Sequence, residues 1–333
     1  MNVPIDRVTI VGDGAMGTVC GLLLAGKGVA VRMWSLFEEQ AAAIEAHREN
    51  QRFLPGHKLP DNFHVTCDTE QALEGSELVV NAVPCQYMRA CWERIGHACP
   101  DGAGVISVAK GIEIDTLRRP TEIILELSTA TDVGVLSGPS IAPEVAAGLP
   151  CTVVAASENE DFAELVQSAF STKCFRVYTN PDPIGVEVAG AAKNVIALAA
   201  GIVDGLCLGD NAKAALLTRG LVEITRLGVA LGGQADTFRG LAGVGDLVTT
   251  CISPVGRNRS AGEKIGQGMT MQEVIDSGDS VIEGIPTTKS VTALAHEYRV
   301  DMPITEAVYS VLFEHLPADE AIELLMSRQL KPE

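Results

Sequence analysis

The sequence predicts a doubly wound α/β domain followed by an all-helical domain. In the first half, short runs rich in β-branched residues alternate with helix-like stretches, which is typical of a parallel sheet covered on both faces. After Asn180 such runs stop, and apolar residues recur at helical spacing, as in 212–231 and 303–313. The segment PDPIGVE separates the two patterns, so we expect domains at 1–182 and 183–333.

Each expected strand is a nearly continuous apolar run, as in a sheet buried on both faces. The first run leads into a helix pattern that extends from about residue 16 to 27, and helical stretches separate most of the later runs. The expected strands are RVTIVG (7–12), VAVRMW (29–34), FHVTC (63–67), ELVVNAVP (77–84), GVISVAK (104–110), VGVLSG (133–138), CTVVAAS (151–157) and FRVYTN (175–180).

Composition excludes several classes of protein. A formal net charge of −18 gives no basic stripe for nucleic-acid phosphates, while 47% apolar residues indicate a globular protein with a large core. The nine cysteines are scattered without C-x-x-C, and the six histidines form no ligand-spaced pair, so we expect reduced thiols in a cytoplasmic protein and no metal site. We expect no signal peptide, and no membrane insertion because the apolar runs break well short of the ~18 residues of a membrane span.

A glycine loop follows the first strand and opens a helix. GDGAMG places Gly12, Gly14 and Gly17 at G-x-G-x-x-G spacing, with Ala15 and Met16 between the last two. The first glycine permits a tight turn, the second lets the backbone approach a pyrophosphate, and the third allows close helix–strand packing. This context predicts a Rossmann-type dinucleotide site, and the alternative is a packing turn in an unrelated α/β domain.

The end of the second strand does not choose between NAD and NADP. An acidic residue there would bind the ribose hydroxyls of NAD, but Ser35 and Leu36 occupy the position. We assign Ser35 to the dinucleotide site. Glu38 and Glu39 belong to the next helix, and Arg32 lies within the strand, so no arginine is placed for a 2′-phosphate.

Polar groups follow two further strands. Lys110 ends GVISVAK, and ligands of doubly wound sheets bind beyond the carboxyl ends of strands; the alternative is an ordinary exposed lysine. Gly138 and Ser140 lie in the turn after VGVLSG, just before Pro143 and a short helix. Ser140 either caps that helix or turns its hydroxyl and nearby amides toward an anion.

A third cluster lies in the helical half. LAGVGDLVTTCISPVGRNR contains Asp246 in a glycine-rich apolar surround, then Thr250, Arg257, Asn258 and Arg259. Arg257 and Arg259 are two positions apart and would not share a helix face, so we expect one of them to point at a given ligand. The alternative is a solvated surface turn.

Lys193 is the lone charge between Glu187 and Asp204. Its helical neighbours three and four positions away are Ala189, Gly190, Ile196 and Ala197, so no intrahelical salt bridge accounts for it. Burial lowers the pKa of a lysine, and an amine tuned toward neutral pH can exchange a proton with an alcohol or a carbonyl oxygen. A lysine that extends to the surface is the alternative.

Taken together, the motifs resemble the NAD(P)-dependent sn-glycerol-3-phosphate dehydrogenases of the bacterial type. The resemblance covers nearly the whole chain, and many long motifs in one order are far more specific than any single motif. They are GDGAMGT, NQRFLPGHKLP, AKGIE, SGPSIAPEVAAGLPC, FRVYTNPDPIGVEVAGAAKNVIALAAGIVDGLCLGDNAKAALLTRGL, GLAGVGDLVTTC, GRNR, VIEGIPTTK and MPITEAVY.

The resemblance implies reversible reduction of dihydroxyacetone phosphate to sn-glycerol 3-phosphate with NAD or NADP, which supplies phospholipid synthesis. It also implies roles for matching positions, with Lys193 as the acid/base. The implied substrate contacts are Lys110, Gly138, Ser140, Lys193, Asp246, Thr250, Arg257 on the phosphate, and Asn258. The implied dinucleotide contacts are Gly12, Gly14, Ala15, Met16, Gly17, Ser35, Lys110, Ala142, Arg257, Val281 and Glu283.

Some positions depart from the family pattern, mostly on the cofactor side. The family often has a serine and an aromatic residue at Ala15 and Met16, and an arginine at Leu36, so the NADP preference is in doubt. Phenylalanine is usual at Ile141 and serine is frequent at Gly256. A related β-hydroxyacid dehydrogenase and a non-catalytic NAD(P) sensor stay open as alternatives, and we expect a homodimer.

Overall fold

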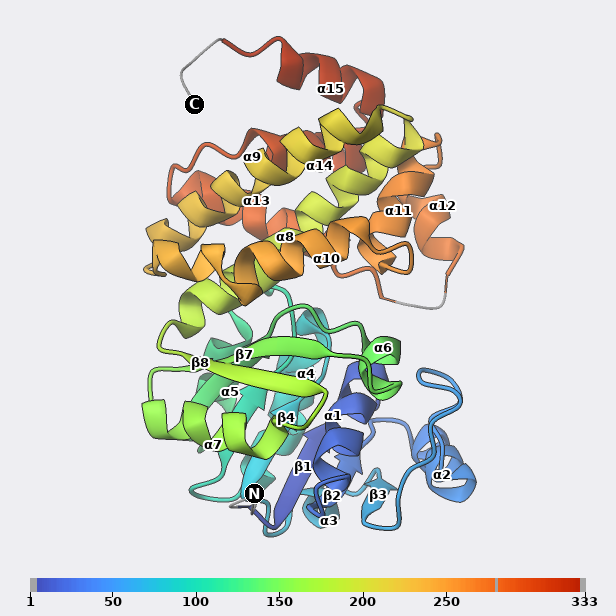
Figure 1. Ribbon diagram of the computed structural model, residues 1–333, viewed down its shortest axis with the longest axis vertical. Helices are drawn as coiled ribbons and strands as arrows, with labels where there is room; N and C mark the ends of the chain where they lie inside the picture. Colours follow the sequence, from blue (N-terminus) through green and yellow to red (C-terminus); the bar gives the residue numbers. More distant parts are fainter. Residues whose placement is uncertain (1–4, 279–280, 330–333) are drawn as a thin grey trace. The chain divides into compact units, whose positions relative to one another are not determined.

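The computed structural model describes residues 5–278 and 281–329, and the chain divides into two compact units (Figure 1). The first unit comprises Met1–Lys110 and Arg118–Pro183. The second comprises Gly111–Leu117 and Ile184–Glu333. A short segment of the first half of the sequence therefore belongs to the second unit.

The first unit is built on an eight-stranded sheet, and all the expected strands form. The strand order β3-β2-β1-β4-β5-β6-β7-β8 reverses direction beside β1, as in doubly wound folds. The strands are β1 (Arg7–Val11), β2 (Ala30–Trp34), β3 (Phe63–Thr66), β4 (Leu78–Asn81), β5 (Gly104–Ser107), β6 (Val133–Ser137), β7 (Cys151–Ser157) and β8 (Phe175–Asn180).

The expectation of a parallel sheet is wrong for the last two strands. β7 pairs antiparallel with β6, and β8 then pairs parallel with β7, so both run against the other six. The connection from β6 to β7 holds a single short helix, α6 (Ala142–Ala146), and β7 starts at the edge where β6 ends. A parallel return would need a crossover along the length of the sheet, which α7 (Glu160–Phe170) provides between β7 and β8.

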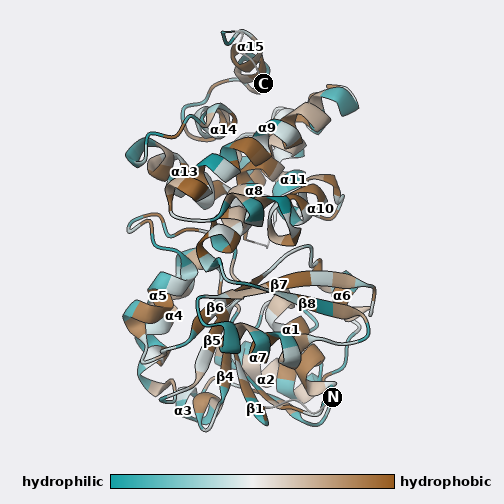
Figure 2. Ribbon diagram, turned by 60° about the vertical axis from the view of Figure 1, so that its left-hand side comes forward, coloured by the Kyte–Doolittle hydropathy of each residue, from teal (hydrophilic) through white to brown (hydrophobic). Residues whose placement is uncertain are grey.

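Both faces of the sheet are buried, because successive strand residues pack into different apolar clusters. Val80 and Ile106 pack in a cluster with Leu24 of α1, whereas Val79 and Val105 pack in another with Trp92 of α4. Figure 2 shows the central strands as mostly hydrophobic. The other helices of this unit are α1 (Ala15–Ala25), α2 (Glu38–His47), α3 (Thr69–Leu73), α4 (Cys85–Ile95) and α5 (Pro120–Leu127).

The second unit contains no β-strand among its described residues. Its helices are α8 (Pro183–Gly205), α9 (Gly209–Ala230), α10 (Asp246–Ile252), α11 (Arg257–Gly266), α12 (Met271–Asp276), α13 (Gly284–Glu297), α14 (Pro303–Phe313) and α15 (Ala318–Met326). A π-helical turn, Leu241–Gly245, leads into α10.

Helix α8 forms the centre of the helical unit. It is long and apolar enough to cross a membrane by length and composition, although Lys193 interrupts its apolar run. Every residue of its most apolar stretch is buried within the protein, as in the core helix of a globular domain. Length and composition are therefore weak evidence for a membrane span here.

Helices α8 and α11 touch backbone to backbone. A Cβ atom on Gly262 would lie 2.0 Å from the carbonyl oxygen of Leu198, and one on Gly201 would lie 2.0 Å from that of Arg259. No side chain fits at either position, so the two glycines set how closely the helices approach. This contact brings Asn258 of α11 to Asn194 of α8, where its Nδ2 donates to Asn194 Oδ1 at 2.9 Å.

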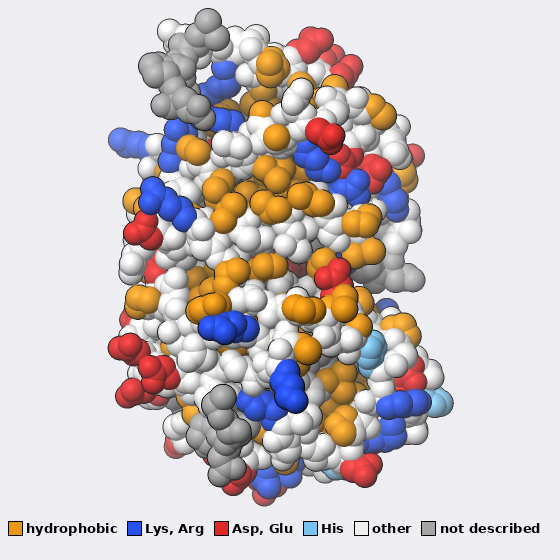
Figure 3. All heavy atoms as spheres, viewed as in Figure 1, with side chains coloured by type: hydrophobic (Ala, Val, Ile, Leu, Met, Phe, Trp, Pro, Cys, Tyr) orange, Lys and Arg blue, Asp and Glu red, His pale blue; other side chains and the backbone are white. Residues whose placement is uncertain are grey.

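Charged side chains are mixed on the surface. On the face drawn in Figure 3, lysines and arginines are interspersed with acidic and hydrophobic side chains rather than gathered into one continuous basic patch of the described residues. All nine cysteines are free thiols. Burial raises the pKa of Cys20 and of Cys251 to about 12, which keeps both thiols protonated at neutral pH.

The N-terminus of α14 is capped by a carboxylate from another helix. Glu223 of α9 accepts hydrogen bonds from the backbone amides of Ile304 at 2.8 Å and Thr305 at 3.2 Å. Met302, the residue before the helix, makes no side-chain cap of its own. Desolvation raises the pKa of Glu223 to about 7, and nearby Asp301 adds to the rise, although the hydrogen bonds oppose it.

Glu223 is therefore expected to make the helical unit less stable as pH rises. Its pKa in the folded chain, about 7, exceeds the ordinary 4.5, so its stabilising effect is complete below about pH 4.5 and is lost through pH 7. The shift corresponds to at most about 3 kcal/mol. Between pH 5 and 7.5 the wild type should lose urea resistance, followed by circular dichroism, relative to Glu223→Gln.

The exposed Glu320→Gln variant is the control, and its pH dependence should match that of the wild type. Parallel urea midpoints for wild type and Glu223→Gln across this range would contradict the assignment.

Candidate functional site

The glycine loop has the geometry of an anion cradle. Gly12 adopts φ +107°, and a Cβ there would lie 3.0 Å from the backbone of Ala82. A Cβ on Gly17 would lie 2.3 Å from the oxygen of Gly12, so both positions require glycine. By contrast, nothing lies within 4 Å of the Cβ position of Gly14, which leaves space for a ligand against the backbone. No side chain caps α1, and its first turn carries no acidic residue, so its amides suit a phosphate.

A polar network that the sequence interpretation missed holds this loop against the end of β2. Ser35 is fully buried, and its hydroxyl donates to Asp13 Oδ2 at 2.7 Å. Asn50 Nδ2 donates to the carbonyl oxygen of Asp13 at 2.7 Å and to Thr18 Oγ1 at 2.8 Å. Asn50 is the first residue of the NQRFLPGHKLP motif, and its place in that motif was the sequence signal that could have pointed to this network. The expected dinucleotide contact of Ser35 stays a prediction.

The polar groups that follow β5 and β6 meet on one carbonyl. Lys110 Nζ donates to the oxygen of Gly138 at 3.1 Å, and Ser140 Oγ donates to the same atom at 3.0 Å. Gly138 has φ +141°, and a Cβ there would lie 3.0 Å from Val153. Since β5 and β6 are parallel neighbours, their carboxyl ends share one edge of the sheet. Ala142 follows at the start of α6.

In the helical unit, Lys193 is buried at 5% exposure and paired with a carboxylate. Its Nζ donates to Asp246 Oδ1 at 2.5 Å and to Thr250 Oγ1 at 2.7 Å. The Thr250 hydroxyl in turn donates to the Asp246 carbonyl oxygen at 2.7 Å. The partner of Lys193 thus comes from α10 rather than from α8, and Lys193 does not extend to the surface.

The two arginines at the start of α11 bind different partners. Arg259 binds Asp204 at 2.7 Å and Glu263 at 3.2 Å and is largely buried. Arg257 is exposed, and its guanidinium donates to the carbonyl oxygen of Val281 at 3.0 Å, with no carboxylate paired to it within 5–278 and 281–329. Of the two, Arg257 is thus the one available to a ligand.

Asn258 connects this helix to two others. Its Nδ2 donates to Asn194 of α8, and its Oδ1 accepts from the amide of Gly284 at 2.9 Å, at the start of α13. Glu283 precedes that glycine as the residue before α13. The expected contacts Asn258, Val281 and Glu283 therefore lie together around the starts of α11 and α13. Asn194 is a further member that the sequence interpretation missed.

Comparison with protein families assigns both units to one family. The model described as the NAD-dependent glycerol-3-phosphate dehydrogenase N-terminus matches residues 7–163. The model described as the C-terminus of the same enzyme matches residues 182–323. The two matches together span most of the chain, with the N-terminal match before the C-terminal one.

Individual relatives align with this chain over nearly their whole length. The chain is 49% identical over 330 residues to glycerol-3-phosphate dehydrogenase [NAD(P)+] of Chlorobium phaeobacteroides (strain BS1), covering 98% of this chain and 99% of that protein. It is 48% identical over 329 residues to the protein of that name from Prosthecochloris aestuarii, with the same coverage. A crystal structure of glycerol-3-phosphate dehydrogenase from Coxiella burnetii superposes with a TM-score of 0.94 at 37% identity, covering 97% of this chain and 99% of that one.

Proposed function

This chain belongs to the NAD-dependent glycerol-3-phosphate dehydrogenase family, and from that premise we propose how its residues perform the reaction. It is an oxidoreductase that reversibly converts dihydroxyacetone phosphate, NAD(P)H and a proton to sn-glycerol 3-phosphate and NAD(P)+. The buried Lys193–Asp246–Thr250 cluster is the observation that carries the proposed mechanism.

The glycine loop fits the dinucleotide that the family requires. Gly14 leaves the backbone open, and the uncapped start of α1 offers its amides to the pyrophosphate, flanked by Ala15 and Met16. The bound NAD(P)H supplies the hydride that reduces the carbonyl carbon of the substrate. We assign Ala142, Val281 and Glu283 to further contacts with the dinucleotide, as the family resemblance implies.

Lys193 is proposed as the group that moves the proton. During reduction of the carbonyl group, Lys193 would give a proton from its ammonium to the carbonyl oxygen, which completes the alcohol. The carboxylate of Asp246 favours the charged form of Lys193 and orients it through the short hydrogen bond. Thr250 fixes the direction of a second N–H of the ammonium.

Arg257 and Lys110 are proposed to hold the anionic end of the substrate. Arginine suits a phosphate because its fork donates to two oxygens at once. Lys110 adds a point charge, and the Gly138–Ser140 turn adds a hydroxyl and backbone amides. Asn258 completes this set and is held in place by its bonds to α8 and α13.

The direct test follows NADH oxidation with dihydroxyacetone phosphate, in parallel with β-keto acids. Turnover with the phosphate, and little with the acids, is the expected result. Preference for a β-keto acid would assign the site to a β-hydroxyacid dehydrogenase. Cofactor binding without turnover of either class would point to a dinucleotide sensor.

Leu36 is expected to set the choice between NADH and NADPH. It follows β2 and is 47% exposed, so a longer polar side chain can replace it without disturbing the core. Leu36→Arg places a fork where a 2′-phosphate would lie. The ratio of kcat/KM for NADPH to that for NADH should rise about tenfold, as one charged hydrogen bond allows.

Leu36→Gln is the matched control, because it removes the leucine without adding charge. The ratio for this variant should stay at the wild-type value. An unchanged ratio in Leu36→Arg would place the adenosine ribose elsewhere.

We also propose that the enzyme works as a homodimer in the cytoplasm. The nine free thiols are compatible with a reducing compartment. The helical unit exposes several apolar side chains, among them Val229 and Leu324, that a second copy could cover. Sedimentation equilibrium at micromolar concentration measures the mass, and a monomer would contradict this part of the proposal.

A further inference from the structure

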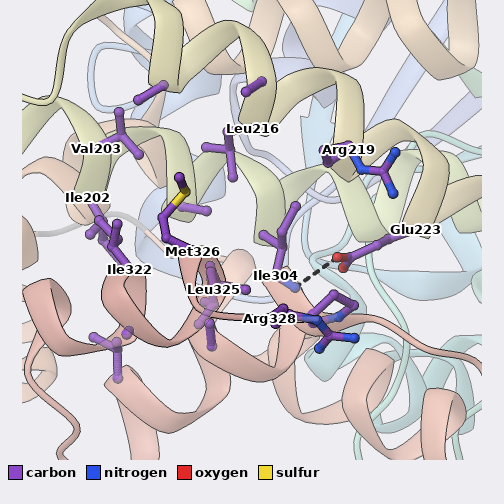
Figure 4. Close-up of a pocket in the computed structure, with 18 of the residues that line it drawn as sticks. Ile202, Val203, Leu216, Arg219, Glu223, Ile304, Ile322, Leu325, Met326 and Arg328 are labelled. Atoms are coloured by element: carbon purple, nitrogen blue, oxygen red, sulfur yellow. Dashed lines mark hydrogen bonds between the residues drawn. The ribbon is translucent and has the colours of Figure 1, made fainter. Parts of the chain in front are cut away.

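The helical unit contains a cavity that shares no residue with the candidate site. Its volume is about 520 Å³, within the range of small-molecule pockets, and α8, α9, α14 and α15 surround it (Figure 4). Each helix contributes a stripe at helical spacing, such as Ala212, Ala215 and Leu216 on α9. Ile202 and Val203 on α8, and the α15 stripe, complete an apolar chamber.

The charged lining residues are gathered at one side of this chamber. Figure 4 shows Arg219, Glu223 and Arg328 together, apart from Ile202, Val203 and Met326. On α9, Arg226 extends the same stripe beyond Glu223. The cavity is therefore amphipathic along its length, with an apolar body and a polar mouth.

The charges at the mouth favour an anion. Three arginines face two carboxylates, Glu223 and Asp301, which leaves a formal charge of +1 even when both carboxylates are ionised. Arg328 is bound to Asp301 at 2.9 Å, and Glu223 is engaged with the start of α14. Within the described part of the chain, no carboxylate pairs with Arg219, although this side chain is half-buried.

We propose that this cavity binds a single-chain amphiphile with a carboxylate head, such as a fatty acid. The alkyl chain would displace water from the apolar stripes, and the head would pair with Arg219 at the mouth. A monoanion matches the single excess positive charge. The proposal does not depend on the dehydrogenase reaction, because none of the lining residues has a role in it.

Isothermal titration calorimetry with laurate, below the concentration at which micelles form, tests the proposal. We expect one site per chain, and at least tenfold weaker binding of dodecyltrimethylammonium, which has the same tail and the opposite charge. Equal affinity for the two amphiphiles, or no binding of laurate, would overturn the proposal.

Two pairs of variants locate the site. Ala215→Trp places an indole on the cavity lining and should abolish laurate binding, whereas Ala214→Trp, at an equally exposed position outside the lining, should not. Arg219→Gln should weaken binding about tenfold, and the distant exposed Arg239→Gln should leave it unchanged. Laurate affinity that is indifferent to both Ala215→Trp and Arg219→Gln would refute the assignment.

Sedimentation equilibrium of the same variants tests whether a second copy of the chain occupies the cavity instead. If laurate fails to bind and Ala215→Trp instead dissociates a dimer, a second copy of the chain covers the cavity and the amphiphile proposal is wrong. Dehydrogenase activity in Ala215→Trp and Arg219→Gln verifies that both variants fold. If one variant has no activity, laurate binding by the other variant decides the test.

Discussion

Lys193→Ala is expected to lower kcat between about a hundredfold and ten-thousandfold, the usual contribution of a general acid or base. The affinity for NADH, measured by fluorescence titration, should stay within about twofold, because the glycine loop that we propose binds it lies in the other unit. Loss of turnover with intact cofactor binding would separate proton transfer from dinucleotide recognition. A variant with near-wild-type kcat would remove Lys193 from the chemistry.

Two controls exclude a general effect of losing a buried charge. Lys213→Ala removes another lysine of the helical unit that is ion-paired, with Asp204 at 2.7 Å, and should keep near-normal kcat. Lys193→Arg keeps a positive charge opposite Asp246, but a guanidinium does not release its proton. Its kcat should therefore remain low. Recovery of activity in Lys193→Arg would mean that charge alone, and not proton transfer, is required.

Arg257→Ala is expected to raise KM for dihydroxyacetone phosphate about ten- to a hundredfold. The estimate follows from the 1.5–3 kcal/mol of a hydrogen bond to a charged group. Unphosphorylated dihydroxyacetone, a much poorer substrate, should lose little kcat/KM, because it has no group for the arginine to hold. Steady-state kinetics with the two ketones side by side provide the measurement.

Arg259→Ala is an informative comparison for this experiment. Arg259 lies two residues away but binds Asp204 and Glu263. Its loss should therefore act mainly by lowering the free energy of unfolding of the helical unit, with little change in KM. Equal effects of Arg257→Ala on both ketones would show that Arg257 does not hold the phosphate.

Local patterns were sufficient to predict the strands and the glycine loop. A buried strand needs a continuous apolar run, and the positions at Gly12 and Gly17 exclude any side chain, so both leave a clear trace in the amino-acid order. The direction of β7 left no such trace. Antiparallel and parallel strands buried on both faces have the same composition, so only the pairing of β7 with β6 in the folded sheet shows its direction.

The local sequence did not predict the partners of the predicted site residues. An isolated lysine among small apolar residues indicated a desolvated amine, and the structure supplied its carboxylate from 53 positions later in the chain. Helical spacing did not distinguish Arg257 from Arg259. The family resemblance implied Arg257, and the structure shows Arg259 bound to Asp204 and Glu263. Asp13 and Asn50 were missed because a polar residue in a loop becomes informative only when its neighbours in space are known.

By itself, then, the order of amino acids determined the class of fold and the family, and it singled out the glycine loop and Lys193 as candidates for phosphate binding and proton transfer. Tertiary structure alone decided which charges neutralise one another, how the last two strands run, and that four helices line an amphipathic cavity. The physical reason is range. Backbone conformation and burial depend on neighbours along the chain, whereas ion pairs and cavities depend on groups that folding brings together.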